Sequence, residues 1–143
     1  MRNDAHVQSV QAIYAAFLRG DVPAILEHLS EDVLWIQQGA PELPYGKVYR
    51  GKAQVAQFVA DLAGVLEFKA FQARTYVSEG ELVVALGDYE TRALAGGGTG
   101  KDDWAMAWTF KDGKVARYQA YVDTLSGAKT LGAVAPAVAP ATA

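Results

Sequence analysis

The chain has 143 residues, of which 51% are hydrophobic and 20% charged, and its formal net charge is −3 at pH 7. This length predicts one domain with a sizeable core, and the lack of a basic surface argues against a nucleic-acid partner. The absence of cysteine excludes disulfides and thiolate chemistry, and no apolar run approaches the roughly 18 residues that span a bilayer. Because the polar first residues are not typical of a signal peptide, we expect a cytoplasmic protein with no membrane partner.

Two helices are predicted at the start of the chain. The first has one apolar face, formed at helical spacing by Val10, Ile13, Tyr14, Phe17 and Leu18. Gly20 ends this helix, and Asp21 caps a second, short one with Pro23 in its first turn. The inner face of the second helix comprises Ile25, Leu26 and Leu29, and a turn is expected at residues 30–32.

A short strand, Val33–Gln38, follows and places Trp35 and Gln37 on the same face. An aromatic wall beside an amide that both donates and accepts hydrogen bonds is typical of a ligand-binding surface. We therefore expect these two side chains to orient a ligand rather than to react with it.

The segment Gly39–Gly51 is predicted to be a loop, because it is rich in glycine and proline. Tyr45 and Tyr49 in this loop are candidates for the mouth or lid of a pocket, and exposed tyrosines without a role are the alternative. The third helix is predicted at Lys52–Leu66, with an inner face of Val55, Phe58, Val59 and Leu62.

The second half of the chain is predicted to form a meander of four strands: Phe68–Ser78, Leu82–Leu94, Trp104–Phe110 and Val115–Asp123. An Asp-Gly pair at residues 112–113 is a strong hairpin signal. Because so long a sheet cannot leave a whole face in water, the upstream helices must cover it. The prediction is an α+β domain over residues 1–125, ordered ααβαββββ, with helices on one side of a bent antiparallel sheet. Residues 126–143 would form a short helix and a mobile Ala/Pro-rich tail.

Three stretches of the chain match a known family pattern in order and spacing. They are YAAFLRGDVPAILEHLSEDVLW, YRGKAQVAQFV and FKDGKVARYQAYVDT, which together lie between about Val10 and Leu125. They resemble the nuclear transport factor 2-like superfamily and, within it, the SnoaL-like and ketosteroid-isomerase-like branch. The resemblance implies a cystatin-like cone in which three N-terminal helices and the sheet surround an apolar pocket, and a homodimer joined sheet to sheet. It implies no single reaction, because isomerases, cyclases, hydrolases and non-catalytic binders share this fold.

The ketosteroid isomerase mechanism needs a carboxylate base on the first strand, a tyrosine on the first helix and a protonated aspartate on a late strand. By resemblance these positions correspond to Gln37, Tyr14 and Met106. An amide and a thioether cannot replace the two acids, so this mechanism is disfavoured. Tyr14 remains a candidate donor to a ligand oxygen, with a core tyrosine whose hydroxyl is already satisfied as the alternative.

Two carboxylates are candidates for proton transfer. Asp123 ends the last strand in a Tyr-Val-Asp-Thr sequence similar to that of SnoaL-like cyclases, although strand parity places it opposite Tyr118 unless a bulge intervenes. Capping of the short C-terminal helix is the alternative for Asp123. Asp88 continues an apolar strand face and is a candidate acid or base. Its alternative is an ion pair with Arg74 or Arg92.

An alternating stripe of Trp104, Met106 and Trp108 is either the lining of a pocket or the core of a dimer. The predicted ligand-binding residues are Trp35, Gln37, Tyr45, Tyr49, Met106 and Tyr118. No metal or cofactor is expected, since the chain has no cysteine and no paired histidine spacing.

The leading hypothesis is a cofactor-free enzyme of the isomerase, cyclase or hydrolase type. It would act by acid–base chemistry on an apolar cyclic or carbonyl-bearing molecule, with Tyr14, Asp123 and Asp88 as catalytic candidates. A non-catalytic ligand-binding protein of the same fold and a dimerisation module with a filled core are the alternatives.

Overall fold

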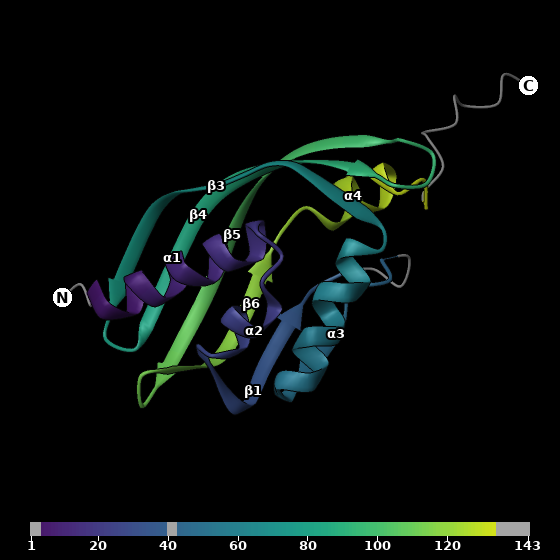
Figure 1. The fold of residues 1–143 in the computed structure, drawn as a ribbon. Helices are drawn as coiled ribbons and strands as arrows, with labels where there is room; N and C mark the ends of the chain where they lie inside the picture. The colour runs from purple at the N-terminus through teal and green to yellow at the C-terminus, as the bar shows by residue number, and fades with distance from the viewer. Residues whose placement is uncertain (1–3, 40–42, 134–143) are drawn as a thin grey trace, which may run out of the picture.

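The computed structural model describes residues 4–39 and 43–133 and shows one bent sheet with helices packed on one side (Figure 1). The strands lie in the order β2-β1-β6-β5-β4-β3. The predicted α+β class is confirmed, with the first three helices on the inner face of the sheet. The elements are α1 (Asp4–Leu18), α2 (Val22–Leu26), β1 (Leu29–Gln37), β2 (Val48–Arg50), α3 (Gly51–Ala63), β3 (Leu66–Glu79), β4 (Leu82–Ala93), β5 (Thr99–Lys111), β6 (Lys114–Tyr121) and α4 (Thr124–Thr130).

The first two helices follow their sequence signals. The apolar stripe of α1 is buried, and Gly20 takes a φ of 72°, a left-handed conformation that glycine adopts at little cost and that ends the helix. Asp21 accepts a hydrogen bond from the backbone N–H of Ala24 at 3.1 Å and so caps α2. The end of α1 and the cap of α2 are as predicted, but α2 ends at Leu26, so Leu29 is not on its inner face as predicted and instead begins β1.

One predicted property of the sheet is wrong, namely its uniformly antiparallel pairing. β1 runs parallel to β6, with Trp35 opposite Tyr118 and Gln37 opposite Ala120, so the sheet is mixed. β1 also begins at Leu29, so residues 30–32 belong to the strand rather than to a turn. A strand's own alternation does not specify which distant strand will pair with it. Pairing with β6 decides both the parallel direction of β1 and its start at Leu29.

Other predicted boundaries also differ from the structure, and β5 begins at Thr99 rather than at the predicted Trp104. Val48–Arg50 forms β2 and pairs with β1, so Tyr49 lies in the sheet and not in a loop. α3 ends at Ala63, where Gly64 is the C-cap, whereas the predicted helix continues to Leu66. Leu66 instead begins β3.

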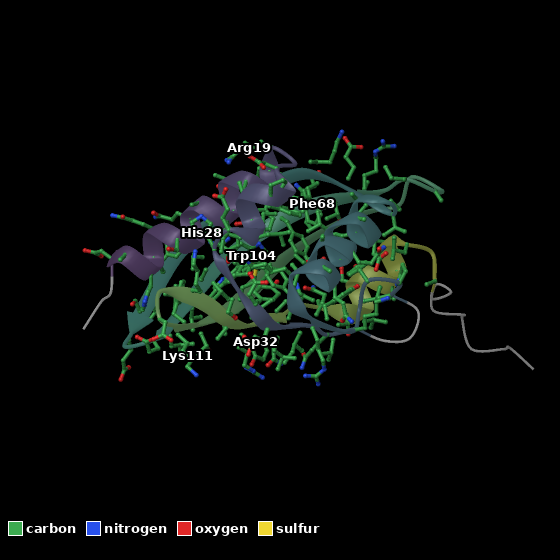
Figure 2. All side chains as sticks on the ribbon, turned by 60° about the horizontal axis from the view of Figure 1, so that its bottom comes forward. Arg19, His28, Asp32, Phe68, Trp104 and Lys111 are labelled. Atoms are coloured by element: carbon green, nitrogen blue, oxygen red, sulfur yellow. The ribbon has the colours of Figure 1, made fainter. Side chains whose placement is uncertain are left out.

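The two faces of the sheet differ in chemistry. Trp104, Met106 and Trp108 point inward and are buried, which excludes them as the core of a sheet-to-sheet dimer. Figure 2 shows Trp104 within the mass of side chains between sheet and helices, whereas Lys111 projects from the surface. Trp104 passes so close to Gly87 that a Cβ at this glycine would meet the indole ring. The exposed outer face carries Val77, Leu82, Leu86 and Tyr121, with 56%, 40%, 40% and 49% of their surfaces accessible.

Helix α4 follows β6 and lies against the tip of the β4–β5 hairpin (Figure 1). The contact is close, because a Cβ at Gly98 or Gly100 would clash with Thr130. The predicted mobile tail falls almost wholly on residues 134–143, outside the described residues. Within residues 4–39 and 43–133, no helix is both long and apolar enough to cross a membrane.

Candidate functional site

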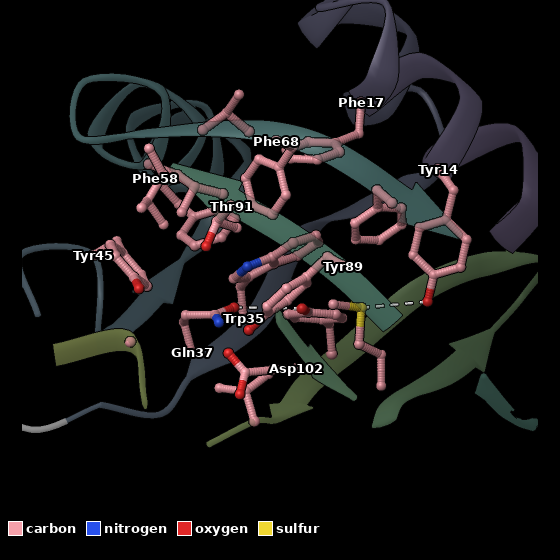
Figure 3. A pocket seen from close by; sticks show the side chains of 18 of the residues that line it. Tyr14, Phe17, Trp35, Gln37, Tyr45, Phe58, Phe68, Tyr89, Thr91 and Asp102 are labelled. Carbon is pink, nitrogen blue, oxygen red and sulfur yellow. Dashed lines mark hydrogen bonds between the residues drawn. The ribbon is translucent and has the colours of Figure 1, made fainter. Parts of the chain in front are cut away.

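An apolar cavity lies between the inner face of the sheet and the helices α1, α3 and α4 (Figure 3). Its volume is about 80 Å³, counted as space open to the centre of a water molecule. Because one water needs about 10–15 Å³ on this measure, the cavity holds several waters or a small organic molecule. Five of the six predicted ligand-binding residues line it: Trp35, Gln37, Tyr45, Met106 and Tyr118.

One end of the cavity is closed by a complete hydrogen-bond network around Tyr14. The indole Nε1–H of Trp108 donates to the Tyr14 hydroxyl at 3.0 Å, and this hydroxyl donates to Sδ of Met106 at 3.4 Å. Burial raises the pKa of the Tyr14 hydroxyl well above its ordinary value, against the lowering effect of the Trp108 donor. Tyr14 is therefore neutral at any ordinary pH, and its hydroxyl is already used by the core.

The other end of the cavity gathers polar groups from several strands. Figure 3 shows Trp35, Gln37, Tyr89 and Asp102 converging there. Gln37 uses its carbonyl oxygen to accept a hydrogen bond from the Tyr118 hydroxyl at 3.3 Å, which leaves its amide nitrogen as a donor. The indole Nε1–H of Trp35 is buried and finds no hydrogen-bond partner among the described residues.

An unpartnered buried donor is costly, since the lost hydration of the N–H is not replaced. Here the donor belongs to a rigid side chain: the Trp35 ring stacks on Tyr118 with centroids 3.9 Å apart. The Trp35 N–H and the Gln37 amide thus form a fixed pair of donors at a cavity wall. This is an arrangement suited to a ligand oxygen.

Asp102 is a cavity residue that the sequence analysis missed. It lies on β5, two residues before Trp104, and therefore shares the inward face of that strand. Its Oδ2 accepts a hydrogen bond from the Ser126 hydroxyl of α4 at 2.8 Å. The available signal was its position in the same alternation as Trp104, Met106 and Trp108.

Two tyrosines face this carboxylate. Burial, and secondarily the charge of Asp102, raise the pKa of Tyr45 to about 12. The pKa of Tyr89 is raised well above its ordinary value by burial, with smaller contributions from Tyr45, Asp102 and Asp123. Both hydroxyls therefore stay protonated and can donate to Asp102 or to a ligand.

Asp123 also lines the cavity, so the structure places this predicted residue near the site. Its Oδ1 accepts the backbone N–H of Ser126 at 2.9 Å and caps α4, so the capping alternative is confirmed. Whether Asp123 has a catalytic role as well stays a prediction.

Two predicted site residues lie away from the cavity. Asp88 is on the outer face of the sheet, where it pairs with Arg74 and accepts a hydrogen bond from Gln72 at 3.3 Å, so the ion-pair alternative is the one observed. Tyr49 packs against Phe58, and its hydroxyl donates to the Tyr45 carbonyl at 3.0 Å. Tyr49 therefore holds the 45–49 segment in place and is not among the residues that line the cavity.

The sequence matches the SnoaL-like domain family over residues 10–118. The fold and site define an α+β protein with an apolar cavity, and the chain belongs to the SnoaL-like domain family. It has the nuclear transport factor 2-like fold. No curated protein matches the chain.

Solved structures with this fold cover nearly the whole chain. A nuclear transport factor 2-like protein from Burkholderia xenovorans is 30% identical, with a TM-score of 0.83 and coverage of 92% of this chain and 98% of the other. TerC, co-crystallised with polyporic acid, is 26% identical, with a TM-score of 0.82 and coverage of 90% and 98%. A proposed polyketide cyclase from Xanthomonas campestris is 22% identical, with a TM-score of 0.72 and coverage of 90% and 97%, and shows the fold alone.

Proposed function

We propose that this protein is a cofactor-free enzyme that binds a small, apolar, carbonyl-bearing ring compound and moves a proton on it. The reaction would be an isomerisation or a cyclisation, the two types in which a proton shift suffices without a cofactor. The fold shared with proteins of these kinds and the co-crystal of similar TerC with polyporic acid support a small-molecule role.

The observation that carries the proposal is the unpartnered Nε1–H of Trp35 beside the Gln37 amide. An unpartnered buried donor costs about 1–3 kcal/mol. Two indole N–H groups of the described residues are in this state, those of Trp35 and Trp104, and Trp35 is the one that lines the cavity. A carbonyl oxygen accepting from the Trp35 N–H and the Gln37 amide would remove this penalty at Trp35. Negative charge that develops on the oxygen as a proton leaves carbon would be stabilised by the same two donors.

The cavity also offers the groups needed to move the proton. Carboxylates of Asp102 and Asp123 line it, and the rest of its wall is mainly aromatic and aliphatic. In such surroundings a carboxylate interacts more strongly with a ligand than it would in water. Oxygen binding and proton transfer can therefore occur on one molecule held between the two kinds of group.

The test uses 2-indanone, a ring ketone, with indane as the matched compound that lacks the oxygen. The indole N–H signals of the protein's three tryptophans are observed by NMR and assigned with Trp35→Phe and Trp108→Phe. We expect 2-indanone to move the Trp35 signal downfield, as a new hydrogen bond requires, and indane to leave it nearly unchanged. Equal responses to the two compounds would contradict an oxygen site at Trp35.

Catalysis is tested with the same ketone in D₂O. Exchange of the hydrogens next to its carbonyl, followed by NMR, should be faster with protein than in buffer containing the same carboxylate concentration. Binding of 2-indanone without any accelerated exchange would instead support the non-catalytic ligand-binding protein.

We also propose a homodimer formed through the outer face of the sheet. The exposed side chains of Val77, Leu82, Leu86 and Tyr121 gather on this face, which no helix covers among the described residues. Apolar surface of this kind is commonly an interface. Sedimentation should show a dimer at micromolar concentration and a monomer for Leu86→Lys, whereas a monomeric wild-type protein would contradict the dimer.

A further inference from the structure

We propose that Asp102 is the proton-transferring carboxylate of this site and that Ser126 of α4 holds it in position. This inference rests on the proposed function and adds to it a specific residue that neither the family match nor the spacing of motifs indicates. It also gives α4 a functional role, because this helix supplies the residue that positions Asp102.

The position of Asp102 follows from the register of the sheet. Asp102 is paired with Tyr89, and Trp104 with Gly87, so the side chains of Asp102 and Tyr89 share the inward face. No ion pair joins Asp102 to a lysine or arginine of residues 4–39 and 43–133. An inward carboxylate without a cation partner is unusual for a structural role, because its charge is normally neutralised by a neighbour.

The hydrogen bond from Ser126 constrains only one oxygen of this carboxylate. Oδ2 accepts from the Ser126 hydroxyl at 2.8 Å, while Oδ1 has no partner among the described residues and remains available to a ligand. Ser126 itself is fixed, since its backbone N–H donates to Asp123. The carboxylate is thus oriented from one side and open on the other, as a proton acceptor must be.

Two neighbouring aspartates differ from Asp102. Asp123 also lines the cavity, but its Oδ1 accepts the backbone N–H of Ser126 and caps α4, so this carboxylate already has a structural role. Asp103 is adjacent to Asp102 in sequence but points to the outer face, where its side chain is 84% exposed and lies 3.5 Å from Arg74. Asp103 is therefore a matched control with the same chemistry on the opposite side of the sheet.

The proposed step conserves atoms and electrons within the ligand and the protein. Asp102 takes a proton from the carbon next to the carbonyl, and the electron pair of the broken C–H bond forms a C=C bond as the carbonyl becomes an enolate. The enolate oxygen accepts from the Trp35 N–H and the Gln37 amide. Asp102 then returns its proton to a carbon of the same conjugated system, which completes an isomerisation without any external reagent.

Contacts of α4 with the hairpin tip support its role in positioning. Thr130 packs against the backbone of Gly98 and Gly100 without room for a side chain there, and its hydroxyl donates to the Ser126 carbonyl at 3.0 Å. Helix α4 is therefore held in one position against strands β4 and β5, from which Ser126 contacts Asp102. A displaced α4 would remove the hydrogen bond to Asp102 and open the polar end of the cavity at once.

The experiment compares Asp102→Asn, Asp123→Asn and Asp103→Asn in the 2-indanone exchange assay. Asp102→Asn should lower the protein-dependent exchange rate by about 100-fold or more, the usual contribution of a positioned acid–base group. It should leave the Trp35 N–H shift caused by 2-indanone in place, because the amide keeps the shape of the site. Asp103→Asn should change the rate by less than about twofold, since an exposed pair on the outer face contributes little.

Ser126 is tested by the division of its effect between kcat and KM. Ser126→Ala should lower kcat by about tenfold with little change in KM, as expected for loss of orientation rather than of binding. Ser126→Thr, which retains the hydroxyl, should restore most of the rate. If Ser126→Ala and Ser126→Thr lost the same activity, and an equal loss of thermal stability explained it, the positioning role of Ser126 would be overturned.

The outcomes separate the two proposals. Exchange by the wild-type protein that persists in Asp102→Asn, or that is abolished only by Asp123→Asn, overturns the assignment to Asp102 and leaves the proposed function standing. No protein-dependent exchange in the wild type overturns the proposed function and the assignment with it.

Discussion

The two ends of the cavity use similar residues to opposite effect. At the Tyr14 end, a tyrosine, a tryptophan and a methionine satisfy one another's hydrogen bonds completely. At the Asp102 end, the Trp35 N–H has no partner among the described residues, and a carboxylate keeps one oxygen open. Trp104, which packs against Tyr14, also has a buried N–H without a partner among these residues, but it does not line the cavity. The unpartnered donor that borders the cavity therefore lies at the Asp102 end, and a ligand is expected there. The comparison places function away from Tyr14, the residue that the family resemblance favours most.

Exchanging each tryptophan for phenylalanine should separate the roles of the two ends most clearly. Trp108→Phe should cost about 3 kcal/mol in the free energy of unfolding, since it leaves Tyr14 without its donor and the core with a void. Trp35→Phe should cost about 1 kcal/mol less, because its N–H makes no hydrogen bond to lose, yet it should abolish the preference for 2-indanone over indane. Urea unfolding and NMR titration measure the two effects. Loss of carbonyl preference in Trp108→Phe alone would reverse the assignment of the two ends.

Tyr14→Phe addresses the same question from the other side. It should destabilise the protein by about 1–2 kcal/mol, since the Trp108 N–H then lacks its acceptor. The exchange rate should fall by less than about tenfold. A rate loss of 100-fold with unchanged stability would mean that Tyr14 takes part in the chemistry after all.

Alkaline pH tests the burial of the tyrosines at the Asp102 end. Because the pKa of Tyr45 is raised to about 12 in the folded state but is near 10 when unfolded, ionisation favours the unfolded chain. The stability that the buried, neutral Tyr45 contributes is complete below pH 10 and is lost as the pH rises towards 12. Between pH 9 and pH 11, wild-type stability should fall by about 1 kcal/mol more than that of Tyr45→Phe. If urea unfolding showed the same loss of stability in the wild type and in Tyr45→Phe, Tyr45 would be hydrated rather than buried.

The smallest effect is expected at Asp88, on the outer face. Asp88→Asn should change the free energy of unfolding by about 0–1 kcal/mol, the usual range for a partly exposed ion pair. Its exchange rate with 2-indanone should equal that of the wild type. A rate loss matching that of Asp102→Asn would show that the outer face communicates with the cavity.

Much of the cavity wall was predictable from strand alternation. The period of two places Trp35 with Gln37, and Met106 with Trp108, and the structure keeps each pair together on the inner face. The same rule applied two residues earlier on β5 would have found Asp102. Asp102 lies outside the predicted strand, which begins at Trp104, whereas β5 begins at Thr99.

Local sequence determined the helices, the hairpins and their order, because caps, glycine turns and apolar periodicity act between residues close along the chain. Tertiary structure decided what depends on distant pairing: the parallel alignment of β1 with β6, the outward position of Asp88 and the seat of α4 over Asp102. A residue's face is a local property, whereas its neighbours across the sheet are chosen by the whole fold. The unsatisfied donor at Trp35 belongs to this second kind, since only the packed protein shows that no partner from residues 4–39 and 43–133 reaches it.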